Sequence, residues 1–196
     1  MKILAFSDIH CDLDAAKKLV AASAEADVVI GAGDFAQLHK GLVATMDALA
    51  GIDGKSVYVP GNNETVEALR SQTKAQVLHG GFVDLHGIRI AGIGCAIPPL
   101  PPTPWGSYDM TEPQAQDVLG AMTSADVLVT HSPPKGVADT HAGLGSLGSV
   151  AVRDWIEEHQ PELVLCGHVH DCWGQEGEIG MSRICNLGPA GAWFEL

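Results

Sequence analysis

The chain has 196 residues, 46% of them hydrophobic, and a formal net charge of −13. Such a surface repels polyanions, which argues against general nucleic-acid binding and against partners in anionic membranes. It remains compatible with a small phosphorylated substrate, because bound divalent cations would reverse the local charge of a site. The hydrophobic share predicts a globular fold, and no apolar run approaches the roughly 20 residues that cross a bilayer.

Two features of the sequence predict a cytoplasmic protein. The apolar N-terminal stretch is too short for a signal peptide and leads directly into Asp8 and His10. The five cysteines are odd in number and have no regular spacing, which is typical of a reducing compartment. Nothing in the sequence indicates an oligomer.

The first part of the chain alternates predicted strands with predicted helices. Apolar runs predict the strands, and apolar residues at helical spacing predict the helices. In chain order these are strand 2–7, helix 13–25, strand 27–30, helix 38–49, strand 56–59 and helix 64–74. This alternation is typical of a layered α/β domain with a largely parallel sheet.

The middle of the chain has a different pattern. Short apolar segments at 77–78, 82–85 and 88–93 are separated by glycines, which predicts antiparallel hairpins. The prolines within 97–104 exclude a helix and a central strand, because proline lacks the backbone N–H donor. A helix is predicted over 111–122, because Thr at its start and Gln three residues later form a capping box.

The last part of the chain again contains strands and one helix. The predicted elements are strand 126–130, a Gly- and Ser-rich loop over 136–149, helix 148–159, strand 163–166 and closing strands at 183–186 and 192–194. No repeat or linker interrupts the chain. We therefore expect one domain over residues 1–196.

Seven side chains of metal-ligand type follow these predicted strands. They are Asp8, His10, Asp34, Asn62, His131, His168 and His170. Ligands bind at the carboxyl ends of the strands in open α/β sheets, so we expect the seven to meet at one edge. Each alone is more often a cap, a turn residue or a hydrogen-bonded loop histidine, but seven coincidences at one edge are improbable. Two carboxylates, one amide and four imidazoles suit two ions of Mn, Fe, Zn, Co or Ni.

This ordered set resembles the calcineurin-like metallophosphoesterase family. The matching motifs are Asp8-Ile9-His10, Gly33-Asp34, Gly61-Asn62, His131 and Gly167-His168-Val169-His170. The resemblance implies an α/β fold, a four-layer α/β/β/α sandwich with mixed sheets. It also implies that Asp8, His10 and His170 hold one ion, that Asn62, His131 and His168 hold the other, and that Asp34 bridges them.

The resemblance implies a dinuclear metal-dependent phosphoesterase in which a hydroxide shared by two ions attacks phosphorus in line. The small single-domain bacterial phosphodiesterase-like branch is the most similar, which favours phosphodiesters such as cyclic nucleotides or aryl and nucleotidyl diesters. Manganese is the favoured ion, and the expected partner is a small phosphorylated substrate. The alternatives are a phosphomonoesterase of the same fold and a non-catalytic scaffold protein of the same fold.

One position departs from the family pattern. Asn63 stands where much of the family has a histidine that helps to protonate the leaving group. An amide cannot act as a general acid, but it can donate a hydrogen bond to a phosphate oxygen, so we assign Asn63 a catalytic and substrate-binding role. His141 is the first candidate for the missing acid and His39 the second; the alternative for each is an exposed loop histidine without a catalytic role.

Two further residues near the expected site have two interpretations each. Glu64 could orient a nearby ligand or cap the helix predicted to follow it. Trp105, in a loop expected at the mouth of the site, could stack on a base or aryl group of the substrate, or it could anchor the loop as a buried residue.

Overall fold

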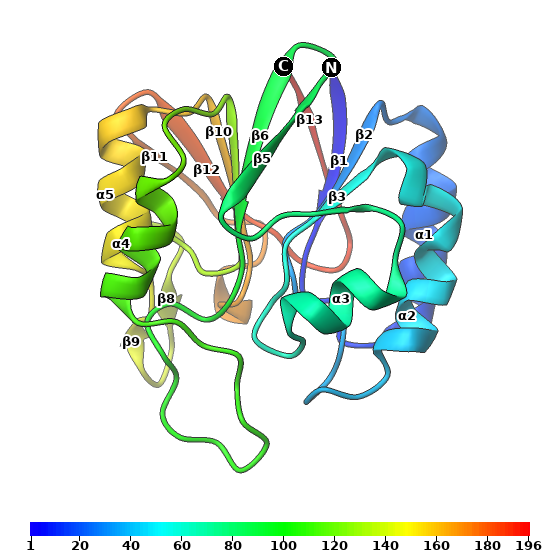
Figure 1. The fold of residues 1–196 in the computed structure, drawn as a ribbon, viewed down its shortest axis with the longest axis horizontal. Coiled ribbons are helices and arrows are strands. Elements are labelled where there is room, and N and C mark those ends of the chain that lie inside the picture. The colour runs from blue at the N-terminus through cyan, green and yellow to red at the C-terminus, as the bar shows by residue number, and fades with distance from the viewer.

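The computed structural model describes residues 1–196, and two β-sheets pack face to face between two layers of helices (Figure 1). In spatial order, the first sheet contains β13 (Ala192–Glu195), β1 (Lys2–Phe6), β2 (Val28–Gly31), β3 (Ser56–Tyr58) and β4 (Gln76–Val77). The second contains β11 (Glu176–Ile179), β12 (Ser182–Asn186), β10 (Leu163–Cys166), β7 (Val127–Thr130), β6 (Ile88–Ile93) and β5 (Gly81–Leu85). A small hairpin joins β8 (Thr140–His141) to β9 (Gly145–Ser146).

The helices divide between the two outer faces. The first sheet carries α1 (Leu13–Ala22), α2 (Leu42–Leu49) and α3 (Val66–Gln72), and the second carries α4 (Glu112–Gly120) and α5 (Val150–His159). Three short 3-10 helices are η1 (Ser23–Glu25), η2 (Ala50–Lys55) and η3 (His170–Cys172). The predicted four-layer α/β/β/α sandwich is therefore confirmed.

Three buried clusters hold the layers together, because the side chains of each strand alternate between its two faces. In β1, Ile3 and Ala5 point into the cluster between the sheets, whereas Leu4 and Phe6 point toward α1 and α2. In β7, Val127 and Val129 complete the central cluster from the other side. Each sheet is thus buried on both faces, which explains why its central strands are continuous apolar runs.

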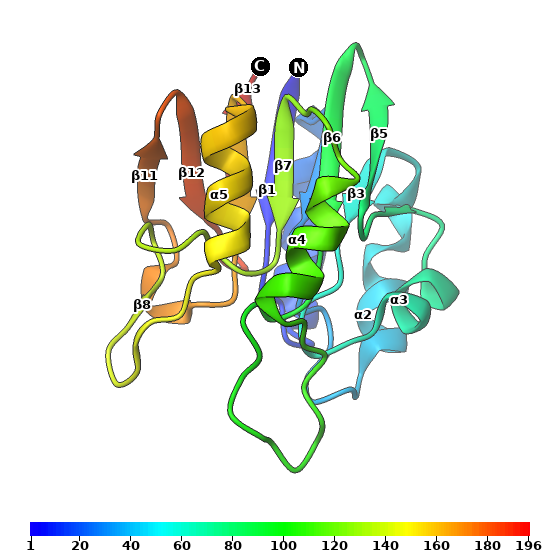
Figure 2. The ribbon, with the colours of Figure 1, turned by 60° about the vertical axis from the view of Figure 1, so that its left-hand side comes forward.

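Both sheets are mixed, as predicted. Strands β1 to β4 run parallel in the first sheet, and β6, β7, β10 and β12 run parallel in the second. The antiparallel strands β13, β5 and β11 lie at the edges. The carboxyl ends of the parallel strands meet at the lower end of the molecule, away from both termini (Figure 2).

The predicted hairpins in the middle of the chain are partly wrong. β5 and β6 do form an antiparallel hairpin, but Val77 belongs to β4, which pairs in parallel with β3. Sequence alternation alone does not reveal which sheet a two-residue strand joins. The sequence also did not predict β11, because the Glu-Gly-Glu sequence at its start has low strand propensity.

The helix predicted over 38–49 begins only at Leu42. Leu38 and His39 have φ angles of 50° and 61°, in the left-handed region, so they cannot continue a right-handed helix. The tight turn from Gln37 to Lys40 holds this conformation, and Leu38 N–H donates to the side chain of Asn63 at 2.7 Å. The other predicted helices are present with shorter ends.

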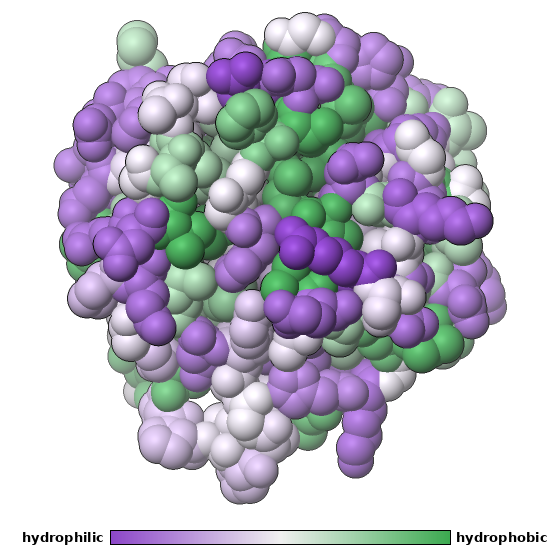
Figure 3. Space-filling model, in the orientation of Figure 1, coloured by the Kyte–Doolittle hydropathy of each residue, from purple (hydrophilic) through white to green (hydrophobic).

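Hydrophilic side chains cover much of the molecular face in Figure 3, with smaller hydrophobic areas between them. None of the helices combines the length and the apolar character needed to span a membrane.

Candidate metal centre

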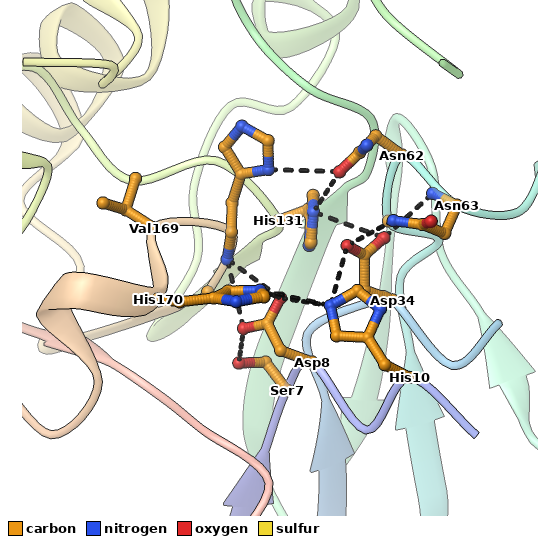
Figure 4. A network of polar contacts seen from close by, with 12 residues as sticks. Ser7, Asp8, His10, Asp34, Asn62, Asn63, His131, Val169 and His170 are labelled. Carbon is orange, nitrogen blue, oxygen red and sulfur yellow. Dashed lines mark hydrogen bonds and ion pairs between the residues drawn. The ribbon is translucent and has the colours of Figure 1, made fainter. Parts of the chain in front are cut away.

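Every predicted metal-ligand residue lies shortly after a parallel strand, six of them in loops and His170 at the start of η3. Asp8 and His10 follow β1, Asp34 follows β2, and Asn62 follows β3. From the second sheet, His131 follows β7, and His168 and His170 follow β10. Residues from both sheets therefore meet in one place, and Figure 4 shows the side chains of Asp8, His10, Asp34, Asn62, His131 and His170 around a common centre.

Four of these residues have an unusual backbone conformation. The φ angles of Asp8, His10, Asp34 and His168 are 53°, 44°, 58° and 70°. The left-handed region costs a non-glycine residue about 1 kcal/mol, and such residues concentrate at functional sites. Backbone hydrogen bonds keep Asp8 and His10 in this conformation. Asp8 N–H donates to Gly33 O and His10 N–H donates to Asp34 O, both at 3.0 Å.

Asp8, His10 and His170 form a cluster of possible metal ligands, here called the first subsite. The Nε2 atoms of the two histidines lie 3.1 Å apart. Asp8 Oδ1 lies 3.7 Å from His170 Nε2 and 4.0 Å from His10 Nε2. His10 Nδ1 lies 3.2 Å from Ala36 O, and a hydrogen bond there leaves Nε2 with its lone pair directed at the subsite.

The side chains of Asn62, His131 and His168 lie together in a second cluster, here called the second subsite. Asn62 Oδ1 lies 3.1 Å from His131 Nε2 and 3.1 Å from His168 Nδ1. His131 Nδ1 donates to Ala32 O at 2.8 Å, which assigns the proton of the buried ring to Nδ1. The lone pair of Nε2 therefore faces the lone pairs of the Asn62 oxygen, an arrangement that a cation between them would stabilise.

The carboxylate of Asp34 lies between the two subsites. Its Oδ2 is 3.6 Å from His10 Nε2, and its Oδ1 is 3.5 Å from His131 Nε2. Asp8, Asp34 and His131 also bring one ligand atom each within 4.8 Å of one another. One oxygen of Asp34 thus faces each subsite, which is the geometry of a bridging ligand.

The donor set fits two divalent ions. Two ligands at about 2.1 Å from one ion, at right angles or tetrahedral angles, lie about 3.0 to 3.4 Å apart. The nitrogen pair of the first subsite and the oxygen–nitrogen pairs of the second have separations of 3.1 Å. Nitrogen and oxygen donors of this kind suit transition-metal ions such as Mn, Fe and Zn.

The electrostatics also favour cations at this site. The ion-pair partners of the buried carboxylates Asp8 and Asp34 are histidines alone. Burial and the negative charge of Asp8 raise the pKa of Asp34. Burial and the neighbouring His131 lower the pKa of His168 to about 3, so this ring is neutral and can bind a metal. Positive ions would compensate two buried like charges that otherwise repel each other.

Asn63 and Glu64 fix the position of Asp34 through hydrogen bonds to its side chain and its backbone. Asn63 donates its backbone N–H to Asp34 Oδ1 at 2.9 Å and its Nδ2 to Asp34 Oδ2 at 2.7 Å. The buried carboxylate of Glu64 accepts three backbone N–H groups at 2.7 to 2.9 Å, those of Asp34, Gly61 and Ala36. Of the two roles considered for Glu64, the structure has the orienting one, because Thr65 caps α3 instead.

The other predicted site residues have local partners outside the ligand cluster. His39 Nε2 lies 2.6 Å from Gly106 O, and its ring centroid is 5.4 Å from that of Trp105, so these two residues join neighbouring loops. His141 lies on the β8–β9 hairpin, where its Nδ1 accepts Gly143 N–H at 3.0 Å. The hydrogen bonds of these side chains go to loop backbone and not to the seven predicted ligands.

Comparison with known proteins assigns the family. The family model described as calcineurin-like phosphoesterase matches residues 1–172, most of the chain. The chain belongs to the calcineurin-like phosphoesterase family. Members of this family use dinuclear divalent metal centres and hydrolyse phosphoesters, which agrees with the candidate ligands found here. None of the curated proteins matches the chain.

Three solved structures illustrate the shared fold. The protein TT1561 of Thermus thermophilus is 24% identical with a TM-score of 0.75, over 96% of this chain and 90% of that one. A dimetal phosphatase from Danio rerio is 14% identical with a TM-score of 0.60, over 97% and 88%. An archaeal phosphodiesterase is 15% identical with a TM-score of 0.54, over 96% and 84%.

Within this phosphoesterase fold, the contacts that sequence reasoning missed include those of Ser107 and Trp173 with predicted ligands. Asn62 Nδ2 donates to Ser107 Oγ at 3.1 Å, which ties the proline-rich loop to the second subsite. Trp173 Nε1 donates to Asp8 Oδ2 at 3.1 Å. Neither residue belongs to a motif, and only the position of Trp173, three residues after His170, could have suggested its proximity.

Proposed function

We propose that residues 1–196 act as a single metallophosphoesterase domain that hydrolyses phosphodiesters with two divalent ions, manganese being favoured. Asp8, His10 and His170 would hold one ion, Asn62, His131 and His168 the other, and Asp34 both. The observation that carries this proposal is the position of Asp34, whose two oxygens lie 3.6 Å and 3.5 Å from histidines of different subsites. A carboxylate with a purely structural role would not require one oxygen to face each of two histidine clusters.

When bound, the two ions would activate water at neutral pH and stabilise the charge of the transition state. The protein holds the donors ready for them. The backbone carbonyl of Ala32 fixes the ring of His131, and that of Ala36 fixes the ring of His10. In both rings Nδ1 bonds to the carbonyl and Nε2 faces the site. Asn63 fixes both oxygens of Asp34, so little reorganisation is needed when ions bind.

The preference for diesters is supported by the surroundings of Asn63. Its side chain bonds to Asp34 and to Leu38 N–H, and an amide has no proton to give a leaving group. A substrate with a good leaving group, such as an aryl or nucleotidyl diester, depends least on protonation of that group by the enzyme. A diester also carries one negative charge fewer than a monoester dianion, which suits a chain of net charge −13.

The remaining roles are proposals of the same kind. The second amide hydrogen of Asn63 Nδ2 would donate to a phosphate oxygen, and Trp105 would stack on an aromatic group of the substrate. His141 would supply a proton for poorer leaving groups. Its hairpin lies beside His170, because Ala142 N–H donates to Asp171 Oδ2 at 2.8 Å. The five free cysteines support the proposal of a cytoplasmic location.

A matched pair of substrates tests the diester preference. We expect Mn²⁺-loaded protein to hydrolyse bis(p-nitrophenyl) phosphate with a kcat/KM at least about tenfold that for p-nitrophenyl phosphate, or about 1.4 kcal/mol. Both substrates release the same phenolate, so the comparison isolates the charge and the second ester group. A higher kcat/KM for the monoester would assign the protein as a phosphomonoesterase. No turnover of either would favour the scaffold.

A further inference from the structure

The indole of Trp173 lies between the first subsite and the segment that leads into β13. Its ring centroid is 4.5 Å from that of His170, with 34° between the planes. It also packs on Gly188, where an added Cβ would lie 3.0 Å from the ring atom Cγ. The ring is therefore held in place although the residue is 40% exposed.

Trp173 also helps to fix which oxygen of Asp8 faces the subsite. Asp8 Oδ2 accepts Ser7 Oγ at 2.5 Å and Trp173 Nε1 at 3.1 Å. The backbone N–H of His168 lies 3.2 Å from both carboxylate oxygens. Two side-chain donors thus occupy Oδ2, and Oδ1 alone faces His10 and His170. The carboxylate can give an ion one oxygen only, and the donors fix its direction.

We propose that Trp173 is a positioning residue of the first subsite, which aligns Asp8 through its indole N–H and His170 through its ring. This inference rests on the proposed function only in requiring that the site binds ions. The hydrogen bond and the ring contact of Trp173 go to Asp8 and His170, and not to Asn62, His131 or His168 of the second subsite. Asp8 Oδ1 faces His10 and His170, so we expect Trp173 to affect one of the two ions more than the other.

Calorimetric titration of metal-free protein with Mn²⁺ tests the proposal. Trp173→Phe keeps an aromatic ring beside His170 and removes the N–H donor to Asp8. We expect one binding step to weaken by about 10- to 100-fold and the other to keep its wild-type affinity. Trp193→Phe is the matched control, because Trp193 is 41% exposed and packs on Lys2 far from the ligands, and both steps should stay unchanged.

Melting curves in chelator show whether each variant is folded. If Trp173→Phe does not fold, Ser7→Ala is the second variant, because it removes the other side-chain donor to Asp8 Oδ2. Ser7→Ala should weaken the same single step. Mn²⁺ should also quench tryptophan fluorescence more in Trp193→Phe than in Trp173→Phe, because Trp173 touches a ligand.

Wild-type affinity at both steps in Trp173→Phe, or equal weakening of both, would overturn the proposal. The result is independent of turnover. If one step weakens but no phosphoester is hydrolysed, the positioning role stands and the proposed function fails. If wild-type protein hydrolyses diesters and Trp173→Phe binds both ions normally, the function stands and the positioning role fails.

Discussion

Asp34→Asn is expected to lower kcat/KM for bis(p-nitrophenyl) phosphate by about 10³-fold or more, equivalent to about 4 kcal/mol of transition-state stabilisation. The change replaces one of the two oxygens that face the subsites by an N–H₂ group, which cannot bind a cation. It also removes the negative charge that would draw both ions together. Steady-state kinetics at saturating Mn²⁺ measure the loss.

The same substitution should leave the fold intact. In metal-free protein, burial and the charge of Asp8 raise the pKa of Asp34. The folded state therefore loses stability as the pH rises above the ordinary pKa of an aspartate. The neutral amide removes this penalty, while one amide N–H would then face an Asn63 donor. We expect a melting temperature in chelator within a few degrees of wild type. Asp47→Asn, on the exposed face of α2, is the matched control and should keep full activity. Substantial activity in a folded Asp34→Asn protein would contradict the bridging role.

Glu64→Ala is expected to cause the largest loss of stability among single substitutions of residues that support the predicted ligands. Three buried N–H groups, those of Asp34, Gly61 and Ala36, would lose their acceptor. An unpartnered buried donor costs about 1 to 3 kcal/mol, so we expect the free energy of unfolding of the Mn²⁺-bound protein to fall by at least about 3 kcal/mol. Denaturant titration measures it.

The loss should be smaller in chelator. Without ions, burial and the charge of Asp34 raise the pKa of Glu64, so the ionised carboxylate carries a penalty that its removal relieves. Bound cations would offset that penalty. Glu64→Gln is the matched control, because it keeps one oxygen acceptor and should cost less than Glu64→Ala. Equal stability of the wild type and Glu64→Ala with Mn²⁺ would show that Glu64 does not support the Asp34 turn.

The sequence predicted most of the framework because the framework depends on local patterns. Continuous apolar runs identified the buried parallel strands, and the capping box at Thr111 and Gln114 marked the start of α4. The ligand residues could be predicted to converge because each follows a parallel strand. Where the pattern is short or polar, as in β4 and β11, pairing is decided by tertiary contacts that sequence periodicity does not contain.

The surroundings of the ligands were less predictable for a physical reason. Asn63 fits a substrate-contacting role by its position after Asn62, yet its side chain joins Asp34 to the backbone of Leu38. The Leu38 N–H comes from the turn at 37–40, where Leu38 and His39 have a left-handed backbone. Trp173 reaches Asp8 across 165 residues of chain, and no local pattern encodes such a contact.

Titration of chelator-treated protein with Mn²⁺ tests most directly whether two ions at this sheet edge catalyse phosphoester hydrolysis. We expect no hydrolysis of bis(p-nitrophenyl) phosphate in metal-free protein. Activity should then rise with added Mn²⁺ and reach its plateau at two equivalents per chain, with the metal content checked by elemental analysis. Full activity in chelator without bound metal, or a plateau at one equivalent, would contradict the dinuclear centre.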